Sequence, residues 1–302
     1  MANRYRRALL ALAGVGVLVG FIGAAWGVPP LNTAKIEQLT GAKGALDTTE
    51  GVFKVSVPRS DLAVTVAGVK MVPALGLTSW AAFQPAGEHV MVMGDLVLQE
   101  DQVAPVMDAA LNNNLEVTAL HNHFLSDAPK VMFMHIGGAG DEETLATAVG
   151  KVFATIQRTA GGKGRLPTAD IDGAASSLDA AAIDGILATT GTISNGVYKA
   201  TIGRTTKMHG HSVGSAMGVN TWCAFAGNDQ LAVVDGDFAM YEPELQPVLK
   251  ALRQADIAVV AIHNHMTHEE PRVVFLHFWG VGPARVLATG IKSALSAQAA
   301  AR

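Results

Sequence analysis

Two His-Asn-His triplets are the residues of this sequence whose types and spacing could do chemistry. Each triplet follows an apolar run typical of a buried β-strand, and successive side chains of a strand point to opposite faces. The two histidines of a triplet should therefore share a face. Neutral imidazole is a good ligand for zinc, copper and iron, so the pattern predicts a transition-metal site. The triplets are His121-Asn122-His123 and His263-Asn264-His265.

A third histidine follows each triplet after a segment with turn-forming residues. In the first case a Ser-Asp-Ala-Pro segment is followed by a second apolar run that ends at His135, and His277 stands at the corresponding place after the second triplet. This order predicts an antiparallel β-hairpin. If the turn centres near Ala128, His121 faces His135, and opposite Cβ atoms lie about 4.5–5.5 Å apart. Three imidazoles would then converge.

The second triplet has two further histidines upstream, His209 and His211, which would share a face on an extended segment. Ala67 and Val69 stand at the corresponding positions of the first copy. We therefore expect the second copy to bind metal more tightly. The competing interpretation is that these histidines are hydrogen-bonded structural residues or acid-base groups. The candidate metal ligands are His121, His123, His135, His209, His211, His263, His265 and His277.

Four carboxylates lie close enough in sequence to complete a metal shell, orient an imidazole or act as a general base: Asp95, Asp237, Glu242 and Glu269. Glu269 is the first choice for the catalytic base and Asp237 the second. The two Gly-Asp pairs that contain Asp95 and Asp237 are interpreted as turn or bulge residues. Zinc or copper is the favoured metal and iron is an alternative.

The chain repeats itself. Trp80-Ala81-Ala82-Phe83 returns as Trp222-Cys223-Ala224-Phe225, and both His-Asn-His triplets obey the same offset of 142 residues (263 minus 121). We expect an α+β fold made of two tandem repeats of an α/β unit, each with an antiparallel histidine-bearing hairpin, packed as a pseudo-dimer. The expected divisions are residues 28–158 for the first repeat, 159–177 for a glycine-containing linker and 178–302 for the second repeat.

Apolar spacing places the main elements around the histidines. Val90 to Leu98 is predicted as a strand, and Asp101 to Asn113 as a helix because Val103, Val106 and Met107 recur at helical spacing. Glu242 to Gln254 repeats that helix. The histidine-bearing strands are expected near the interface between the repeats or on one shared sheet.

Composition excludes several classes of function. The chain has 302 residues, of which 49% are hydrophobic and 16% charged, with a formal net charge of −4. It can build a sizeable core, and it lacks the basic surface that nucleic-acid binding requires. Its one cysteine, Cys223, allows neither an intramolecular disulfide nor a cysteine-rich metal site.

Residues 1–27 are expected to be a signal peptide or an N-terminal anchor. Arg4, Arg6 and Arg7 precede an uncharged apolar stretch that ends in small residues. The body of the protein is therefore expected to be periplasmic or secreted. It would contact a membrane only through this segment, if the segment stays uncleaved.

Two segments stand out beside the two His-Asn-His strands: residues 57–62 (Val-Pro-Arg-Ser-Asp-Leu) and residues 76–83 (Gly-Leu-Thr-Ser-Trp-Ala-Ala-Phe). On these segments and strands the sequence resembles the LppY/LpqO family, and the resemblance covers nearly the whole mature chain. It implies an exported bacterial protein and no particular activity. The chain departs from the lipoprotein members of that family because it lacks the lipid-attachment cysteine.

Two functions follow from these patterns. The first is an exported protein that binds or handles a transition metal. The second is a metal-dependent enzyme, a hydrolase in which the metal lowers the pKa of a bound water to about 7 and Glu269 or Asp237 accepts its proton. The expected partners are the metal ion and a small-molecule ligand.

Overall fold

The structure is a computed structural model, and it describes residues 30–162 and 166–301. The predicted signal peptide or anchor lies outside the described residues. Across the two described ranges, no helix is both long and apolar enough to cross a membrane.

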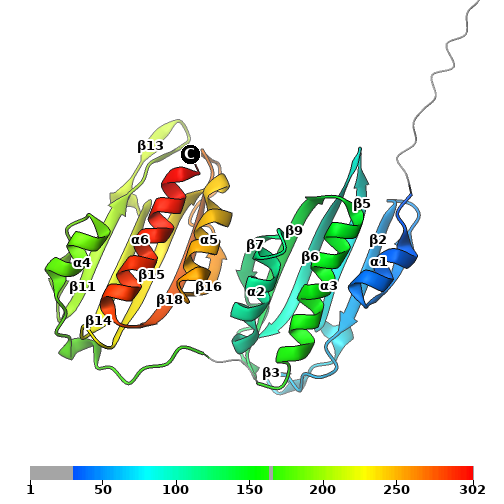
Figure 1. Cartoon of the computed structure of the whole chain (residues 1–302), viewed down its shortest axis with the longest axis horizontal. Coiled ribbons are helices and arrows are strands. Elements are labelled where there is room, and N and C mark those ends of the chain that lie inside the picture. Colours follow the sequence, from blue (N-terminus) through cyan, green and yellow to red (C-terminus); the bar gives the residue numbers. More distant parts are fainter. Residues whose placement is uncertain (1–29, 163–165, 302) are drawn as a thin grey trace, which may run out of the picture.

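One twelve-stranded antiparallel sheet runs through both repeats, and its strand order reads as a palindrome (Figure 1). Six strands of the first repeat are followed by the six equivalent strands of the second repeat in reverse order. From the outer edge inward, the first repeat supplies β1 (Lys43–Asp47), β2 (Val52–Pro58), β5 (Thr78–Ala86), β6 (His89–Gln99), β9 (Val131–Gly140) and β7 (Glu116–His121). From the centre outward, the second repeat supplies β16 (Ala258–His263), β18 (Val273–Gly282), β15 (Ala232–Tyr241), β14 (Asn220–Gly227), β11 (Val197–Gly203) and β10 (Thr192–Ser194).

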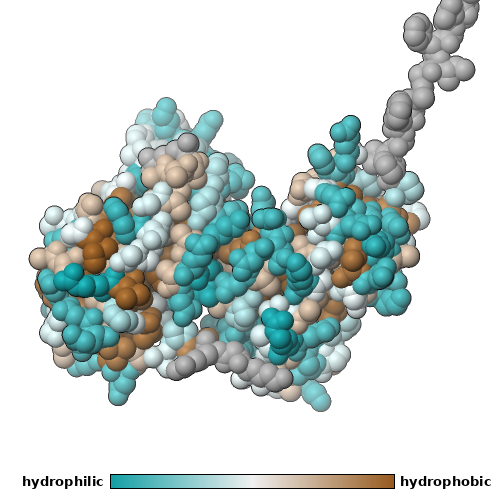
Figure 2. All heavy atoms as spheres, viewed as in Figure 1, coloured by the Kyte–Doolittle hydropathy of each residue, from teal (hydrophilic) through white to brown (hydrophobic). Residues whose placement is uncertain are grey.

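Within the part of the chain that the structure describes, six α-helices lie over one face of this sheet (Figure 1). The predicted helices at Asp101 to Asn113 and Glu242 to Gln254 are confirmed, and each begins with a 3-10 turn, η2 (Glu100–Gln102) or η5 (Glu242–Glu244). Hydrophilic residues predominate on the outer surface of this helical layer, with apolar patches between them (Figure 2). The helices are α1 (Thr33–Thr40), α2 (Val103–Leu111), α3 (Glu142–Thr159), α4 (Ala180–Leu187), α5 (Leu245–Gln254) and α6 (Ala284–Ala300).

Apolar periodicity explains why the helices dock on the sheet. On α5, Leu245, Val248, Leu249 and Leu252 are buried, which is the stripe that a helix of 3.6 residues per turn presents to a core. The facing residues of the strands alternate with residues that point away from the helices. The histidines of β7, β9, β16 and β18 belong to that second set, so they lie on the face of the sheet opposite the helices.

Part of this opposite face is covered by two small three-stranded sheets. One contains β3 (Thr65–Val66), β4 (Val69–Lys70) and β8 (Asp127–Ala128), and the other contains β12 (Thr206–Met208), β13 (His211–Val213) and β17 (Glu269–Glu270). β8 and β17 belong to the loops that follow the His-Asn-His triplets. A small apolar core lies in each half, and its members include Phe133 in the first repeat and Phe275 in the second.

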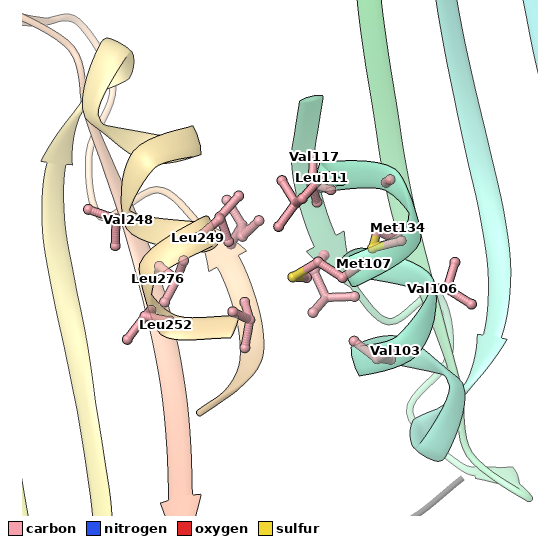
Figure 3. Packing of buried hydrophobic residues seen from close by; sticks show 14 of the residues in the cluster. Val103, Val106, Met107, Leu111, Val117, Met134, Val248, Leu249, Leu252 and Leu276 are labelled. Carbon is pink, nitrogen blue, oxygen red and sulfur yellow. The ribbon is translucent and has the colours of Figure 1, made fainter. Parts of the chain in front are cut away.

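The two repeats meet through equivalent elements. At the centre of the sheet, β7 pairs with β16 through Leu120 and Ile262. Above this seam, α2 and α5 lie side by side, and Figure 3 shows buried side chains of both helices, including Met107 and Leu249. Because the same surface of each repeat takes part, the contact has the form of an isologous dimer interface. The predicted pseudo-dimer on one shared sheet is therefore confirmed.

Polar contacts across the seam are asymmetric. The Gln246 side chain accepts a hydrogen bond from Val117 N (3.0 Å) and donates one to Val117 O (2.9 Å). Arg253 forms a bidentate ion pair with Asp108, with Nε–Oδ1 and Nη2–Oδ2 distances of 2.9 and 3.2 Å. Gln246 thus completes the backbone hydrogen bonding of β7 where the strand has no neighbour from β16.

Candidate metal centre

Asp237 lies in the middle of β15, directly opposite His277 of β18. The interpretation of the Gly-Asp pair as a turn or bulge is wrong, because Gly236 and Asp237 are regular strand residues. Gly236 is needed for packing: a Cβ there would collide with the Phe278 ring and the carbonyl of Trp222. The strand thereby places a carboxylate, 2% exposed, on the face that carries the histidines.

Burial raises the pKa of Asp237, and the neighbouring His277 and His265 oppose that shift. Its Oδ1 accepts a hydrogen bond from Leu276 N at 3.1 Å. Its Oδ2 lies 3.2 Å from His265 Nε2 and 4.0 Å from His263 Nε2. One carboxylate oxygen is thus fixed by the backbone, and the other faces two imidazoles.

His263 is the last residue of β16. The preceding residue, Ile262, packs under the helices, so His263 points to the opposite face. Burial, with His277 and His265 nearby, lowers its pKa to about 4. The imidazole is therefore neutral over the physiological range, which is the form that binds metal. Its Nδ1 is buried and has no hydrogen-bond partner among the described residues.

His265 follows two residues later, in the loop that leads to β17. Its ring stacks on Phe275 with centroids 3.5 Å apart, and its Nε2 lies 3.1 Å from His263 Nε2. Ligand atoms of Asp237, His263 and His265 all lie within 4.8 Å of one another. Ligands about 2.0–2.1 Å from a tetrahedral zinc are about 3.3 Å apart, so this group has the spacing of a metal centre.

His277 lies beside this group and outside it. Its ring stacks on His263 with centroids 4.6 Å apart and an interplanar angle of 13°. Its Nδ1 lies 3.3 Å from Gly236 O, so it donates a hydrogen bond to this carbonyl. His277 therefore holds the His263 ring in place.

The first repeat carries the same residue types, Asp95, His121, His123 and His135, in a different arrangement. Among the described residues, these four do not form a group with the spacing of a metal site. His135 Nε2 lies 3.9 Å from Asp95 Oδ1, and the His121 and His135 rings stack with centroids 5.1 Å apart. Burial lowers the pKa of His123, and Asp95 opposes the shift.

The predicted register of the histidine-bearing hairpin is wrong by two residues. His121 pairs with Phe133, and His135 pairs with Ala119. The register is centred on Asp127 instead of Ala128, and β7 has an irregularity between Val117 and Ala119. The imidazoles of His121 and His135 are therefore diagonal neighbours, close enough to stack but not directly opposite.

The predicted placement of His209 and His211 on one extended face is also wrong. His209 has a φ of 50° and Gly210 a φ of 81°, so these two residues form the tight turn between β12 and β13. His211 is exposed in β13. No hydrogen bond or ring contact within the described chain joins either imidazole to the group around Asp237.

Glu269, the first choice for a catalytic base, supports the loop instead. Its Oε1 accepts a hydrogen bond from Val273 N at 3.1 Å. Asp127 does the same for Val131 N (2.7 Å) in the first repeat. The structure places Glu269 outside the ligand group and Asp237 within it.

Sequence reasoning missed Asp235, which lies on the same strand face as Asp237. Burial raises its pKa, and His277 opposes the shift. The signal for it was the alternation Asp235-Gly236-Asp237, which puts two carboxylates on one face once the segment is known to be a strand.

Comparisons with known proteins give a family and no activity. No functionally curated protein matches the chain. A solved structure of PduB, a trimeric bacterial microcompartment shell protein, is similar at 10% sequence identity, with 84% of this chain and 89% of that chain covered. Its TM-score is 0.21, which is too low to indicate a shared function. A family model matches the chain twice, over residues 34–155 and 181–297. The protein therefore belongs to the family described as a Domain of Unknown Function (DUF1259), and it contains two copies of that domain.

Proposed function

We propose that this protein binds a transition metal through Asp237, His263 and His265 of the second repeat. The observation that carries the proposal is the convergence of a buried carboxylate oxygen and two imidazole nitrogens to within 4.8 Å. Two imidazoles and one carboxylate are a ligand set used by zinc and by non-haem iron(II). Zinc is the metal we propose, with copper and iron as the other outcomes of the test.

Elemental analysis of protein purified without a histidine tag tests this proposal. We expect about one equivalent of one metal in the parent, and a large loss in a His263→Ala/His265→Ala variant that keeps its circular dichroism spectrum. The matched His121→Ala/His123→Ala variant should keep the metal. Absence of metal from the parent after reconstitution, or equal loss from both variants, would overturn the proposal.

A metal-dependent hydrolase is the second candidate, and one observation favours it. His263 also lines a cleft of about 580 Å³ between the repeats, and three protein ligands leave a coordination position for water or substrate. Zinc supplies a water of lowered pKa when bound in this way. Hydrolysis of p-nitrophenyl acetate that disappears in the His263→Ala/His265→Ala variant would support this function, and equal rates in both proteins would contradict it.

We further propose that the protein is exported. The support is the order of residues 1–27, in which arginines precede an apolar stretch, together with the resemblance to the exported LppY/LpqO family. Cell fractionation should find the protein outside the cytoplasm, and N-terminal sequencing should distinguish a cleaved signal peptide from an anchor. Recovery of the full chain from the cytoplasm would contradict this proposal.

A further inference from the structure

The cleft beside His263 exists because the two repeats share only a short seam. β7 and β16 pair at Leu120 and Ile262, and the strands then diverge. The cleft of about 580 Å³ opens where they part, a volume within the range of small-molecule sites. Its polar lining comes from both repeats and includes Glu116, Thr118, Glu242, His263, Asn264 and Arg272.

Three charged side chains of this lining have no charged or hydrogen-bonding side-chain partner within residues 30–162 and 166–301. Glu116, Glu242 and Arg272 form neither an ion pair nor a side-chain hydrogen bond with any residue of the described ranges. Two carboxylates and one guanidinium therefore remain free for a ligand. Their formal sum is negative, which disfavours phosphate-rich and other polyanionic ligands.

A second cleft, lined by the equivalent residues, lies at the other end of the contact between the repeats, and its charged side chains are paired. Glu100 and Lys130 stand at the positions of Glu242 and Arg272, and they form an ion pair of 3.8 Å. That cleft measures about 320 Å³ and is lined in part by Leu166, a linker residue. In this cleft the two equivalent charges pair with each other and the linker forms part of the wall, whereas Glu242 and Arg272 of the open cleft form no ion pair within the described residues.

Apolar side chains form the rest of the open cleft. Leu245, Ile262 and Val274 line it beside the charged groups. A ligand that fits carries an anionic group for Arg272, a cationic group for Glu116 or Glu242, and a short apolar part for these side chains. Free α-amino acids have this combination.

We propose that this cleft is a binding site for a small zwitterionic ligand of the amino-acid class. The carboxylate of the ligand pairs with Arg272, and its ammonium group pairs with the two glutamates. His263 belongs both to the cleft and to the metal group, so the ligand lies next to the metal. The site depends on its own charged residues and does not require the metal.

Isothermal titration calorimetry on the whole chain, in metal-free and zinc-loaded form, tests this inference with a panel of L-amino acids that includes leucine. At least one amino acid should bind saturably. Its amide, which lacks the carboxylate, and its N-acetyl derivative, which lacks the ammonium group, should each bind about 10–100-fold more weakly. Absence of saturable binding by every amino acid, or binding of either derivative as tightly as the unmodified amino acid, would overturn the proposal.

Matched variants locate the site. Arg272→Gln and Glu242→Gln should each weaken binding by about 10–100-fold, because a charge-assisted contact is lost. Lys130→Gln and Glu100→Gln, at the equivalent positions of the other cleft, should leave binding unchanged. All four variants should keep the metal content of the parent, so failure of the metal proposal and failure of this one give different results. Equal weakening at the two clefts would overturn the assignment.

Discussion

The two repeats carry the same four residue types at equivalent positions, yet they arrange them differently. Asp95, with the three histidines of the first repeat, corresponds residue by residue to Asp237 with the three histidines of the second. The Asp95 side chain is 15% exposed and meets His135 at 3.9 Å, whereas Asp237 is 2% exposed and meets His265 at 3.2 Å. Identical residue types at equivalent positions therefore do not give the same spacing of the candidate ligand atoms.

The difference lies in the residues around the ligands. Where the second repeat has Asp235, the first has Met93, which is 66% exposed. In the first repeat, Phe124 packs edge-on against His123 and Phe133, and Met266 occupies that position in the second. A flexible methionine adapts to its neighbours more easily than a phenylalanine ring. These neighbours differ between a repeat in which the second histidine of the triplet lies 3.2 Å from the carboxylate and a repeat in which the described residues show no such contact.

The largest effect is expected where the repeats neutralise a buried arginine differently. In the second repeat the Arg204 side chain is 6% exposed, and its Nη2 lies 2.9 Å from both carboxylate oxygens of Glu244. The equivalent arginine of the first repeat, Arg59, forms an ion pair with Asp61 and donates a hydrogen bond to the side-chain amide oxygen of Gln102. Glu244→Gln recreates the first repeat's amide but leaves Arg204 without its counter-charge. We expect a loss of about 3–5 kcal/mol in the free energy of unfolding.

Urea denaturation measures this loss, with Asp61→Asn as the control. The Asp61 side chain is 41% exposed, so water can reach the charge that it leaves on Arg59, and its removal should cost less than the loss of the buried Glu244 charge. Equal losses in the two variants would show that the repeats do not differ in how they hold the buried cation.

The next largest effect is the loss of metal affinity when Asp237 or its counterpart Asp95 is replaced. Replacing groups that only orient a metal ligand costs about 10–100-fold in metal affinity, so loss of a charged ligand by Asp237→Asn should cost at least about a hundredfold. Asp95→Asn should leave the affinity unchanged, because Asp95 belongs to no ligand group among the described residues. Competition with a chromogenic chelator measures both. A comparable loss in Asp95→Asn would erase the distinction between the repeats.

The architecture was predictable because a repeat at a constant offset leaves few alternatives. The matching triplets and tryptophan segments predicted two equivalent units, and apolar spacing predicted α2 and α5 to within a few residues. The single pairing of Leu120 with Ile262 was not predictable. Both sides of the seam are apolar strands, so nothing in the pattern distinguishes an edge strand from a central one.

The site was predicted less well than the fold, and three residues show why. Asp237 was ranked below Glu269 because a Gly-Asp pair is typical of turns, whereas Gly236 is required by the packing of Phe278 across strands. His209 was included because an i, i+2 pair shares a face only in a strand, and a positive φ at His209 ends the strand. Sequence periodicity locates residues on elements but does not give their distances in space.

Acidification should distinguish the partly buried His263 of the second repeat from its counterpart in the first. Burial lowers the pKa of His263 to about 4 in the folded protein, below the value of about 6.5 in the unfolded chain. Between these values the unfolded state binds more protons, so stability falls as pH decreases from about 6.5 and the loss is complete below about 4. Metal-free parent protein should lose about 1–2 kcal/mol more than His263→Gln between pH 7 and pH 5.

Urea denaturation of both proteins at each pH provides the measurement. Burial also lowers the pKa of His123 in the first repeat, but Asp95 opposes the shift, so His123→Gln should change the pH dependence less. Parallel pH profiles for the parent and His263→Gln would contradict the burial of this imidazole.

The smallest change in stability is expected at the contact between the two repeats. Arg253 pairs with Asp108 on one side of the pseudo-two-fold axis, and the equivalent positions are Leu111 and Lys250, which cannot form such a pair. Asp108 is 38% exposed, so solvent screens the pair, and a double-mutant cycle of Arg253→Ala and Asp108→Ala should give a coupling of about 1 kcal/mol. Because the core between α2 and α5 is continuous, the apolar contacts hold the repeats together. A coupling of several kcal/mol would instead show that this ion pair contributes more than the apolar contacts to the association of the two repeats.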